Sequence, residues 1–438
     1  MEPAEIWAYG LAPDILFESD EQGVCLKSPA ETIRFSAASD VTLVRKLRQG
    51  RVSETALSAC LAPDVDAPNV CASFLFRLDK HGFLTRFLMQ GSQVIAACIP
   101  QRAPPGARPD IDPGKPFRLS SQMLLQPRKQ GLRAQVPGSW AVLDLLDPRL
   151  GSLLFGACDN TEDPQSPTCV PGLEPPVLAA LIGLFDWCGL TKDSSDQDHP
   201  KHDALFHSHT RLGFRRAQLG KTGRQAPSVP HPIGISSIPL PLPDMAKLIA
   251  SDPPHAQVSR QRRSRRVQGA EPISHAQLGE LLFRCFYQDN GRRTYPSGGG
   301  VYPLTAYLIV NRCDGLKQGL YTYDTLHHGL TMIAEFNSAL KSLLKDASAA
   351  ANCASQTQVL LVFSADMMAM RTAYGDLAYS LVLKEVGAVY QNVQLAGEAM
   401  RLATCPLGTG NSVTFAQASG LDIDHAPSVG EMCIGSLG

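Results

Sequence analysis

The sequence lacks the features that mark several common functional classes. Its 438 residues include 40 Lys and Arg against 41 Asp and Glu, so no overall basic field exists to hold nucleic acid or an anionic membrane. The longest apolar run, residues 177–185, is too short to cross a bilayer. The acidic N-terminus lacks the basic segment and apolar core of a signal peptide. These absences predict a cytoplasmic protein without nucleic-acid or membrane partners.

Metal and nucleotide motifs are also missing. None of the 12 cysteines forms a C-x-x-C pair, no GKS or GKT follows a glycine-rich loop, and no G-x-G-x-x-G opens a strand–turn–helix unit. A short segment nevertheless carries four histidines, His199, His202, His207 and His209. Metal sites prefer helical or hairpin spacing with a carboxylate or thiolate partner. The favoured interpretation is a boundary segment with no metal site.

What the chain does contain is globular, with 44% apolar and 18% charged residues. Two proline-rich seams, at residues 100–116 and 227–254, divide it, because proline disfavours continuous helix and sheet. The predicted organisation has four parts: residues 1–99, 100–195, a connector at 196–256, and 257–438.

The first part combines short strands with short helices. Strands are predicted at 15–17, 24–27 and 32–35, and helices at 41–47 and 70–84. This order favours a winged-helix unit, and residues 12–95 resemble the peptide-clamp domains related to PqqD. A generic winged helix that serves only in packing is the alternative.

The second part is predicted to repeat this plan as another winged-helix-like unit. Strands are expected at 117–119, 123–126 and 132–136, and helices at 140–146 and 176–190. For the last part, residues 257–438, the sequence predicts an α+β layered domain. Its expected elements are strands at 305–310, 320–323, 330–334 and 359–363 and a long helix at 376–402.

Three short segments in the last part contain residue types that suit the binding of a cofactor. The run SRQRRSRR (259–266) has five arginines, whose guanidinium groups match phosphate oxygens, although a solvated linker is the alternative. PSGGG (296–300) offers free amides to a flat ring, or a flexible turn. Glu385, Gly387, Gln391 and Asn392 interrupt an otherwise apolar helix, and such polar groups need partners.

Read in order, five motifs resemble nitroreductase-type flavoproteins, and more narrowly the SagB-type dehydrogenases of ribosomal-peptide pathways. They are R-R-S-x-R (262–266), P-S-G-G-G-V-Y-P-L (296–304), G-L-Y-T-Y-D (319–324), Y-G…E-x-G-x-x-x-Q-N (374–392) and C-P-L-G (405–408). The match is collinear over about residues 257–438. Azoline oxidases of streptolysin S-like, cyanobactin and trifolitoxin-like pathways belong to that family.

The resemblance implies FMN bound non-covalently at a homodimer interface. The phosphate and ribityl chain would be held by Arg262, Arg263, Ser264 and Arg266. The ring would be lined by Pro296, Ser297, Gly298 and Gly299, with Gly408 and Thr409 near the flavin N5. Gln391 and Asn392 would support the site from the long helix.

One position departs from the family pattern. Azoline oxidases often carry Lys-Tyr before the glycine that opens the long helix, and here the pair is Ala373-Tyr374. Tyr374 is the candidate general base, but a phenol with a pKa of about 10 needs help from a neighbour. Lys384 lies ten residues on, and helical geometry does not put it beside Tyr374.

The resulting prediction is an FMN-dependent enzyme that dehydrogenates azolines to thiazoles or oxazoles in a ribosomally synthesised precursor peptide. The winged-helix units would bind the leader peptide, and a cyclodehydratase partner would make the azoline first. The alternatives are another flavin-dependent tailoring reaction, which the alanine at position 373 motivates, a non-catalytic peptide-binding scaffold, and a winged-helix nucleic-acid regulator, which the net charge disfavours.

Overall fold

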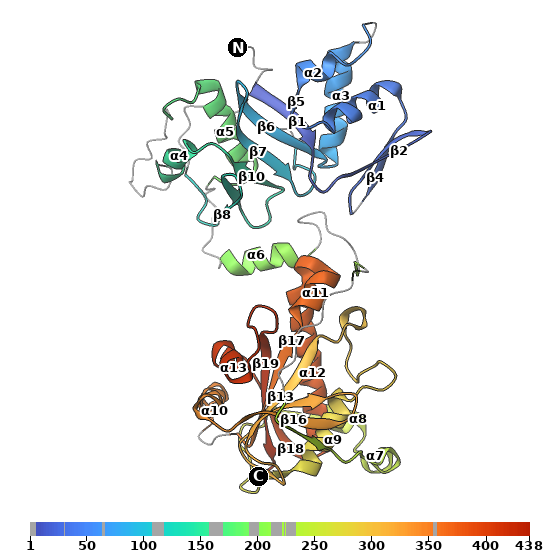
Figure 1. Ribbon diagram of the computed structural model, residues 1–438, viewed down its shortest axis with the longest axis vertical. Coiled ribbons are helices and arrows are strands. Elements are labelled where there is room, and N and C mark those ends of the chain that lie inside the picture. Colours follow the sequence, from blue (N-terminus) through green and yellow to red (C-terminus); the bar gives the residue numbers. More distant parts are fainter. Residues whose placement is uncertain are drawn as a thin grey trace. The chain divides into compact units, whose positions relative to one another are not determined.

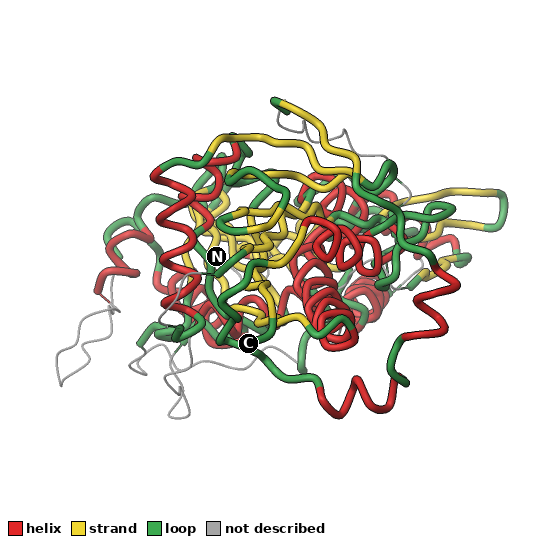
Figure 2. The backbone as a smooth tube through the Cα atoms, turned by 90° about the horizontal axis from the view of Figure 1, so that it is seen from below, coloured by secondary structure: helices red, strands yellow, loops and turns green. Residues whose placement is uncertain are grey.

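The chain folds into two compact units, Met1–Leu219 and Gly220–Gly438, in the computed structural model (Figure 1). The structure describes residues 6–29, 31–63, 66–106, 118–156, 170–191, 201–211, 221–222, 224, 234–353 and 357–438. Helices and strands occur in both units, and Figure 2 shows the helices and strands along the whole described backbone, which confirms the predicted mixture of helix and sheet.

The first unit opens with a three-stranded antiparallel sheet followed by three helices. The strands pair in the order β2 (Leu16–Asp20), β3 (Gly23–Lys27), β4 (Thr32–Phe35). The helices are α1 (Ala38–Leu47), α2 (Glu54–Ser58) and α3 (Ala67–Lys80). The prediction extended the last helix to residue 84. It ends at Lys80 because Gly82 adopts a φ of 67° and a strand begins at Leu84.

A seven-stranded sheet forms the rest of the first unit. Its order is β5 (Val52–Ser53), β1 (Trp7–Leu11), β6 (Leu84–Gln90), β7 (Gln93–Pro100), β10 (Ala141–Leu145), β9 (Leu132–Gln135), β8 (Leu124–Pro127). The remaining helices are α4 (Leu150–Gly156), α5 (Pro175–Trp187) and α6 (Lys201–Thr210). Because β7 pairs with β10, the segments before and after the first proline-rich seam share one sheet. This differs from the separate units expected at 1–99 and 100–195.

The strand β10 corrects the helix predicted at residues 140–146. Ala141, Val142, Leu143 and Leu145 are buried on both faces of the sheet, because β10 lies between β7 and β9. A short apolar run of this kind has no periodicity that separates a buried strand from a helix. Phe117, at the start of a predicted strand, lies outside the described residues, and the winged-helix assignment stays a prediction.

The second unit is built on a seven-stranded antiparallel sheet. The strand order is β11 (Ser236–Pro239), β16 (Gly329–Glu335), β15 (Gly319–Asp324), β13 (Leu304–Val310), β17 (Val359–Ala365), β19 (Ser428–Ser436), β18 (Leu402–Leu407). A parallel pair, β12 (Ile273–Ser274) and β14 (Cys313–Asp314), lies apart from it. The predicted connector at 196–256 is therefore not only a linker, because β11 pairs with β16 at the edge of this sheet.

Helices cover both faces of this sheet (Figure 1). The helices of this unit are α7 (Met245–Ser251), α8 (His255–Gln261), α9 (His275–Phe286), α10 (Ser338–Ala350), α11 (Met367–Tyr374), α12 (Ala378–Ala399) and α13 (Ser412–Ser419). Of these, α9, α11 and α12 pack on one face of the sheet, and α10 and α13 pack on the other. Alternate residues of β13 belong to opposite faces: Leu304, Ala306 and Leu308 pack with α9 and α12, whereas Tyr307 and Ile309 pack with α10 and α13. Burial on both faces explains why β17 is apolar along most of its length.

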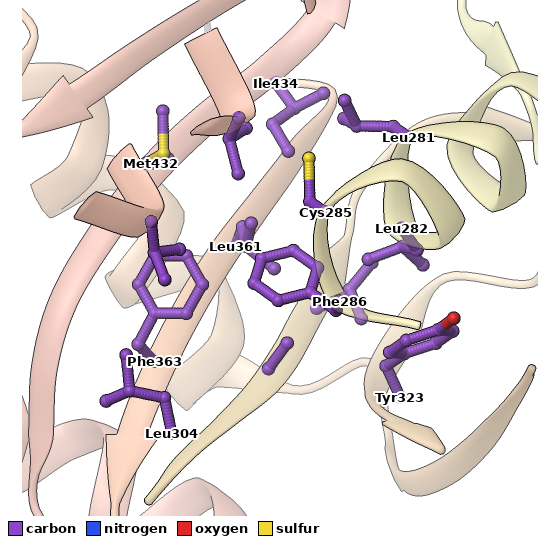
Figure 3. Close-up of a cluster of buried hydrophobic side chains, with 14 of the residues drawn as sticks. Leu281, Leu282, Cys285, Phe286, Leu304, Tyr323, Leu361, Phe363, Met432 and Ile434 are labelled. Atoms are coloured by element: carbon purple, nitrogen blue, oxygen red, sulfur yellow. The ribbon is translucent and has the colours of Figure 1, made fainter. Parts of the chain in front are cut away.

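The core between α9 and the sheet is rich in aromatic side chains. Phe286 of α9 and Phe363 of β17 face one another with ring centroids 5.8 Å apart, and Cys285 and Met432 border the same cluster (Figure 3). This packing fixes α9 and α12 on one face of the sheet. The long helix predicted at 376–402 is present as α12, which ends before β18 begins at Leu402.

Candidate functional site

The predicted site residues lie around α12, and they are attached to it at several points. Glu385 contacts the loop of residues 296–300, here called the serine–glycine loop. Gln394 contacts the arginine run. At 3.6 residues per turn, nine residues are about two and a half turns, so Glu385 and Gln394 point to opposite sides of the helix. We call these sides the phenol flank, which holds Glu385, and the arginine flank, which holds Gln394.

On the phenol flank, Ser297 fixes the serine–glycine loop. Its hydroxyl donates to Glu385 Oε2 at 2.7 Å and accepts from the Tyr302 amide at 2.8 Å. The hydroxyl proton is therefore committed to Glu385. Ser297 was predicted to line a ring, and the structure leaves its backbone, rather than its hydroxyl proton, for that role.

Glu385 is a buried carboxyl group beside this loop. Burial raises its pKa to about 6, against the lowering effects of the Ser297 hydrogen bond, the Arg293 charge and the Gly298 amide. Its second oxygen, Oε1, has no hydrogen-bond partner among the described residues. A carboxyl that titrates near neutral pH can hold or release a proton within this flank.

Tyr374 closes the phenol flank from the end of α11. Gly299 adopts a φ of 57°, and any Cβ at this position would collide with Tyr374 Oη. A Cβ at Gly298 would lie 3.8 Å from both the Tyr374 ring and Leu381. The phenol oxygen thus rests against the glycine backbone, so Tyr374 and Gly299, which the sequence suggested for separate roles, lie side by side. Ala373 is only 3% exposed, so that position faces the core.

On the arginine flank, the five arginines differ in the contacts of their side chains. Arg262 donates to Gln394 Oε1 at 3.3 Å, and Gln394 Nε2 contacts Ser264 Oγ at 3.3 Å. Arg265 forms a salt bridge with Glu398 at 2.8 Å and donates its amide to Thr404 O. No salt bridge within the described ranges involves Arg263 or Arg266, and both are exposed. Arg260 is exposed as well, so the fold uses Arg265 and leaves Arg260, Arg263 and Arg266 without a salt bridge among the described residues.

The loop of residues 408–410, here called the second loop, follows β18 on the same flank. It lines a cavity of about 370 Å³ together with Tyr379, Leu383 and Gly387 of α12. A Cβ at Gly408 would meet no atom within 4 Å, so the backbone there faces open space. This accessible backbone is what the prediction for Gly408 and Thr409 needs.

Glu431 of β19 supports the second loop from behind. Its carboxyl group accepts from the Asn411 amide, and Tyr390 Oη accepts from the Glu431 amide at 2.8 Å. Burial raises the pKa of Glu431 to about 7. Its Oε1 also has no hydrogen-bond partner in the part of the chain that the structure describes. Sequence reasoning missed Glu431, because β19 was not among the predicted strands.

The structure therefore brings the predicted residues together in two groups rather than one. Pro296, Ser297, Gly298, Gly299 and Tyr374 lie on the phenol flank. The arginine run and the second loop lie on the arginine flank, joined through the contact of Arg265 with β18. Sequence reasoning missed Gln394, although a glutamine in an apolar helix is the signal that could have found it. Asn392, predicted as a support, donates to Thr294 Oγ1 at 2.9 Å.

Two further observations concern functions outside this site. No helix within the described ranges is both long and apolar enough to cross a membrane. Among the residues that the structure describes, no three His, Cys, Asp or Glu side chains gather as a metal site requires. Of the four histidines noted above, His199 lies outside the described residues, and His202, His207 and His209 lie on α6.

Comparison with known proteins identifies the second unit. The model of the nitroreductase family matches residues 259–436. A protein of Methanocaldococcus jannaschii that carries the name nitroreductase is 30% identical over 173 residues, which cover 38% of this chain and 82% of that protein.

Solved structures give weaker likenesses. A nitroreductase-named structure from Ralstonia eutropha has 23% identity and a TM-score of 0.39, covering 50% of this chain and 99% of that one. The E. coli microcin synthetase McbBCD complex with truncated pro-MccB17 has 20% identity and a TM-score of 0.36, covering 47% and 89%. The assignment rests on the sequence matches: through its residues 259–436, the chain belongs to the nitroreductase family.

Proposed function

We propose that the chain is an FMN-dependent oxidoreductase that dehydrogenates azolines to thiazoles or oxazoles in a ribosomally synthesised precursor peptide, as a step in the maturation of a peptide antibiotic or toxin. Family membership supports oxidoreductase chemistry with a flavin. The observation that carries the proposal further is the placement of the Tyr374 phenol directly against the Gly299 backbone. That contact puts a proton-accepting group beside a surface suited to a flat ring.

The residues on the two flanks fit FMN. Arg263 and Arg266 carry exposed guanidinium groups that match a phosphate, with Arg262 and Ser264 held nearby by Gln394. The second loop turns free backbone toward a cavity. We assign the phosphate and ribityl chain to Arg262, Arg263, Ser264 and Arg266. We assign the ring to Pro296, Ser297, Gly298, Gly299, Gly408 and Thr409.

A second copy of the chain would join the two groups into one site. Within one chain they face opposite sides of α12, so a ligand that needs both must lie between copies. Apolar surface is available for such contact: α7 has no buried residue, Ile249 is 78% exposed, and α7 borders a cavity of about 980 Å³. We propose a homodimer whose site takes the phenol flank from one copy and the arginine flank from the other.

Mixing two inactive variants tests this arrangement. Tyr374→Phe and the double variant R263A/R266A, which removes both exposed guanidinium groups, damage different flanks, so a mixed dimer keeps one intact site. By statistical mixing, about a quarter of the wild-type activity returns when the two variants are unfolded and refolded together. Refolding each variant alone is the control and restores nothing. Failure of the mixture to recover activity, with mixed dimers present, would place both flanks in the site of one chain.

In the proposed reaction the azoline ring loses two hydrogens. Tyr374 accepts one as a proton from ring carbon, and Glu385, bound to Ser297, keeps the serine–glycine loop in shape around the phenol. The flavin, when bound, supplies the oxidising power for the other hydrogen and its electron pair, with oxygen as the final acceptor. The protein's own contribution is orientation and proton transfer.

The first unit offers a place for the leader peptide. β4 is one of the two outer strands of the three-stranded sheet. It is the one that α3 contacts, with Arg77 over the Phe35 ring and His81 3.0 Å from Glu31. Phe76 of α3 is 69% exposed. We propose that the peptide adds as a strand to β4 and that this tethering raises the effective concentration of its azolines. A cyclodehydratase partner must supply the azoline.

Turnover of a defined substrate tests the proposal. The purified chain, supplied with FMN and an azoline-containing peptide, should reduce the peptide mass by two hydrogens per ring. Tyr374→Phe should bind FMN with wild-type stoichiometry and leave the peptide unchanged. A different mass change would favour another flavin-dependent tailoring reaction, and flavin binding without any change in the peptide would overturn the enzymatic proposal.

A further inference from the structure

Residues from far upstream reach the end of α11. The Thr222 amide donates to Ala373 O at 2.9 Å, and the Thr222 hydroxyl donates to Thr372 O at 2.7 Å, across 150 residues of sequence. These acceptors belong to the last turn of α11, where helix carbonyls lack partners within the helix. Thr222 thus fixes its neighbour Lys221 next to Tyr374.

Lys221 and Tyr374 approach the same point of the serine–glycine loop. A Cβ at Gly299 would lie 3.3 Å from Lys221 Cδ, and the same Cβ would collide with Tyr374 Oη. The ammonium group lies two bonds beyond Cδ, on a flexible stem. Rotation about the bonds of this stem can turn the charge toward the phenol oxygen.

We propose that Lys221 is a positioning residue that supplies the positive charge stabilising deprotonated Tyr374. The role of that phenolate rests on the proposed function. A phenol is a weak base at neutral pH unless a neighbouring cation favours its charged form. The residue directly before Tyr374 cannot provide that cation, because Ala373 has no charge and faces the core. Lys221 lies in the predicted connector at 196–256, where spacing gives no sign of this contact.

The other charged groups on the surrounding elements are bound elsewhere, lie farther along the chain, or carry the opposite sign. Arg371 of α11 donates to Asp424 O, and Glu385 of α12 is bound to Ser297. Asp376 follows in the next turn and carries the opposite charge. Lys384 is exposed on α12, ten residues after Tyr374. Lys221 is the cation whose stem packs at the Gly299 contact point.

Ultraviolet titration of tyrosinate tests the proposal without any turnover. The signal of Tyr374 is the difference between each protein and its Tyr374→Phe counterpart. We expect Lys221→Met to move the midpoint of that signal upward by about one pH unit, because an opposite charge within a few ångströms shifts a titration by about one to three units. Lys221→Arg should keep the wild-type midpoint. Lys341→Met makes the same change of charge on α10, across the sheet from α12, and should leave the midpoint unchanged.

The pH profile of azoline oxidation gives a second readout. Its rising limb should move to higher pH in Lys221→Met by the same amount, since the base must be deprotonated. An unchanged tyrosinate midpoint in Lys221→Met, or an equal shift in Lys341→Met, overturns the inference. A shifted midpoint in a protein that does not oxidise azolines leaves the Lys221–Tyr374 pair standing and rejects the proposed function instead.

Discussion

The two loops on either side of α12 are each held by a buried glutamate, but their surroundings differ. Glu385 binds the serine–glycine loop through Ser297. Glu431 lies against Gly410 of the second loop and accepts from the amide of the next residue, Asn411. Gly299 in the first loop is pressed against Tyr374, whereas Gly408 in the second faces empty space. The contacts of the serine–glycine loop are thus made within one chain, whereas the second loop leaves its backbone open to a ligand or to another chain.

Alanine substitution of Gly299 and of Gly408 should give the largest difference between the serine–glycine loop and the second loop. Gly299→Ala forces a side chain into a left-handed backbone position and against Tyr374 Oη, at a cost of about 1–3 kcal/mol. We expect kcat/KM for azoline oxidation to fall by more than about tenfold as the phenol moves. Gly408→Ala, with no neighbour to strike, should preserve Tm. Wild-type activity in Gly299→Ala would contradict the close contact.

The buried charge of Glu431 should make stability fall with rising pH. Its pKa is raised from an ordinary 4.5 to about 7, so between these values the folded protein holds a proton that the unfolded chain has lost. The stabilising effect is full below pH 4.5 and is lost as pH rises through about 7. Glu431→Gln should remove this contribution, worth about 3 kcal/mol, and leave the smaller slope that Glu385 adds between pH 4.5 and about 6. Urea unfolding between pH 4 and 8 measures it.

The matched control is an exposed carboxyl group. Glu335 is paired with Lys317 on the surface, and that contact lowers its pKa. Glu335→Gln should leave the slope between pH 4.5 and 7 in place. If Glu431→Gln and Glu335→Gln behave alike, the carboxyl behind the second loop is not buried as described.

Removal of Glu385 should loosen only the phenol flank. Glu385→Ala deprives the Ser297 hydroxyl of its acceptor in a buried place, which costs about 1–3 kcal/mol of unfolding free energy. Glu385→Gln keeps an oxygen at the same position and should lose much less. Chemical denaturation compares the two variants. Equal losses would show that the charge, rather than the hydrogen bond to Ser297, matters.

The smallest expected effect distinguishes two neighbouring arginines. Arg266→Ala should weaken FMN binding about tenfold with little change in Tm, because its guanidinium has no salt bridge among the described residues. Arg265→Ala should lower Tm, because it leaves the largely buried Glu398 without its partner. Fluorescence titration with FMN and thermal unfolding measure the pair. If Arg265→Ala weakened FMN binding and Arg266→Ala lowered Tm, the two arginines would have the opposite roles.

Local sequence patterns predicted much of the second unit. Strands β13 and β17 and helix α12 carry the continuous apolar runs and periodicity that burial on two faces requires. The first unit was harder, since β10 has the same apolar composition as a buried helix. Its sharing of a sheet with β7 depends on pairing across the proline-rich seam, which no local pattern encodes.

The site was predictable where a motif is contiguous and not where contacts are distant. Ser297, Gly299 and the arginine run were found as motifs. Their partners Glu431 and Lys221 come from separate segments, so only the folded chain brings them to the loops. Glu385 and Gln394 point to opposite sides of α12, which divides the site between two flanks. Their spacing in the sequence gives this angle, but its meaning is clear only when the contacts of each residue are known.

We propose that α12 carries two half-sites that a second copy of the chain completes into a flavin site. The most direct test is the FMN content of the freshly purified protein, resolved by oligomeric state through size-exclusion chromatography with detection of flavin absorbance. The account predicts one FMN per chain in the dimer and none in the monomer. A dimer that stays colourless after FMN is added, or a monomer that binds FMN stoichiometrically, would contradict it.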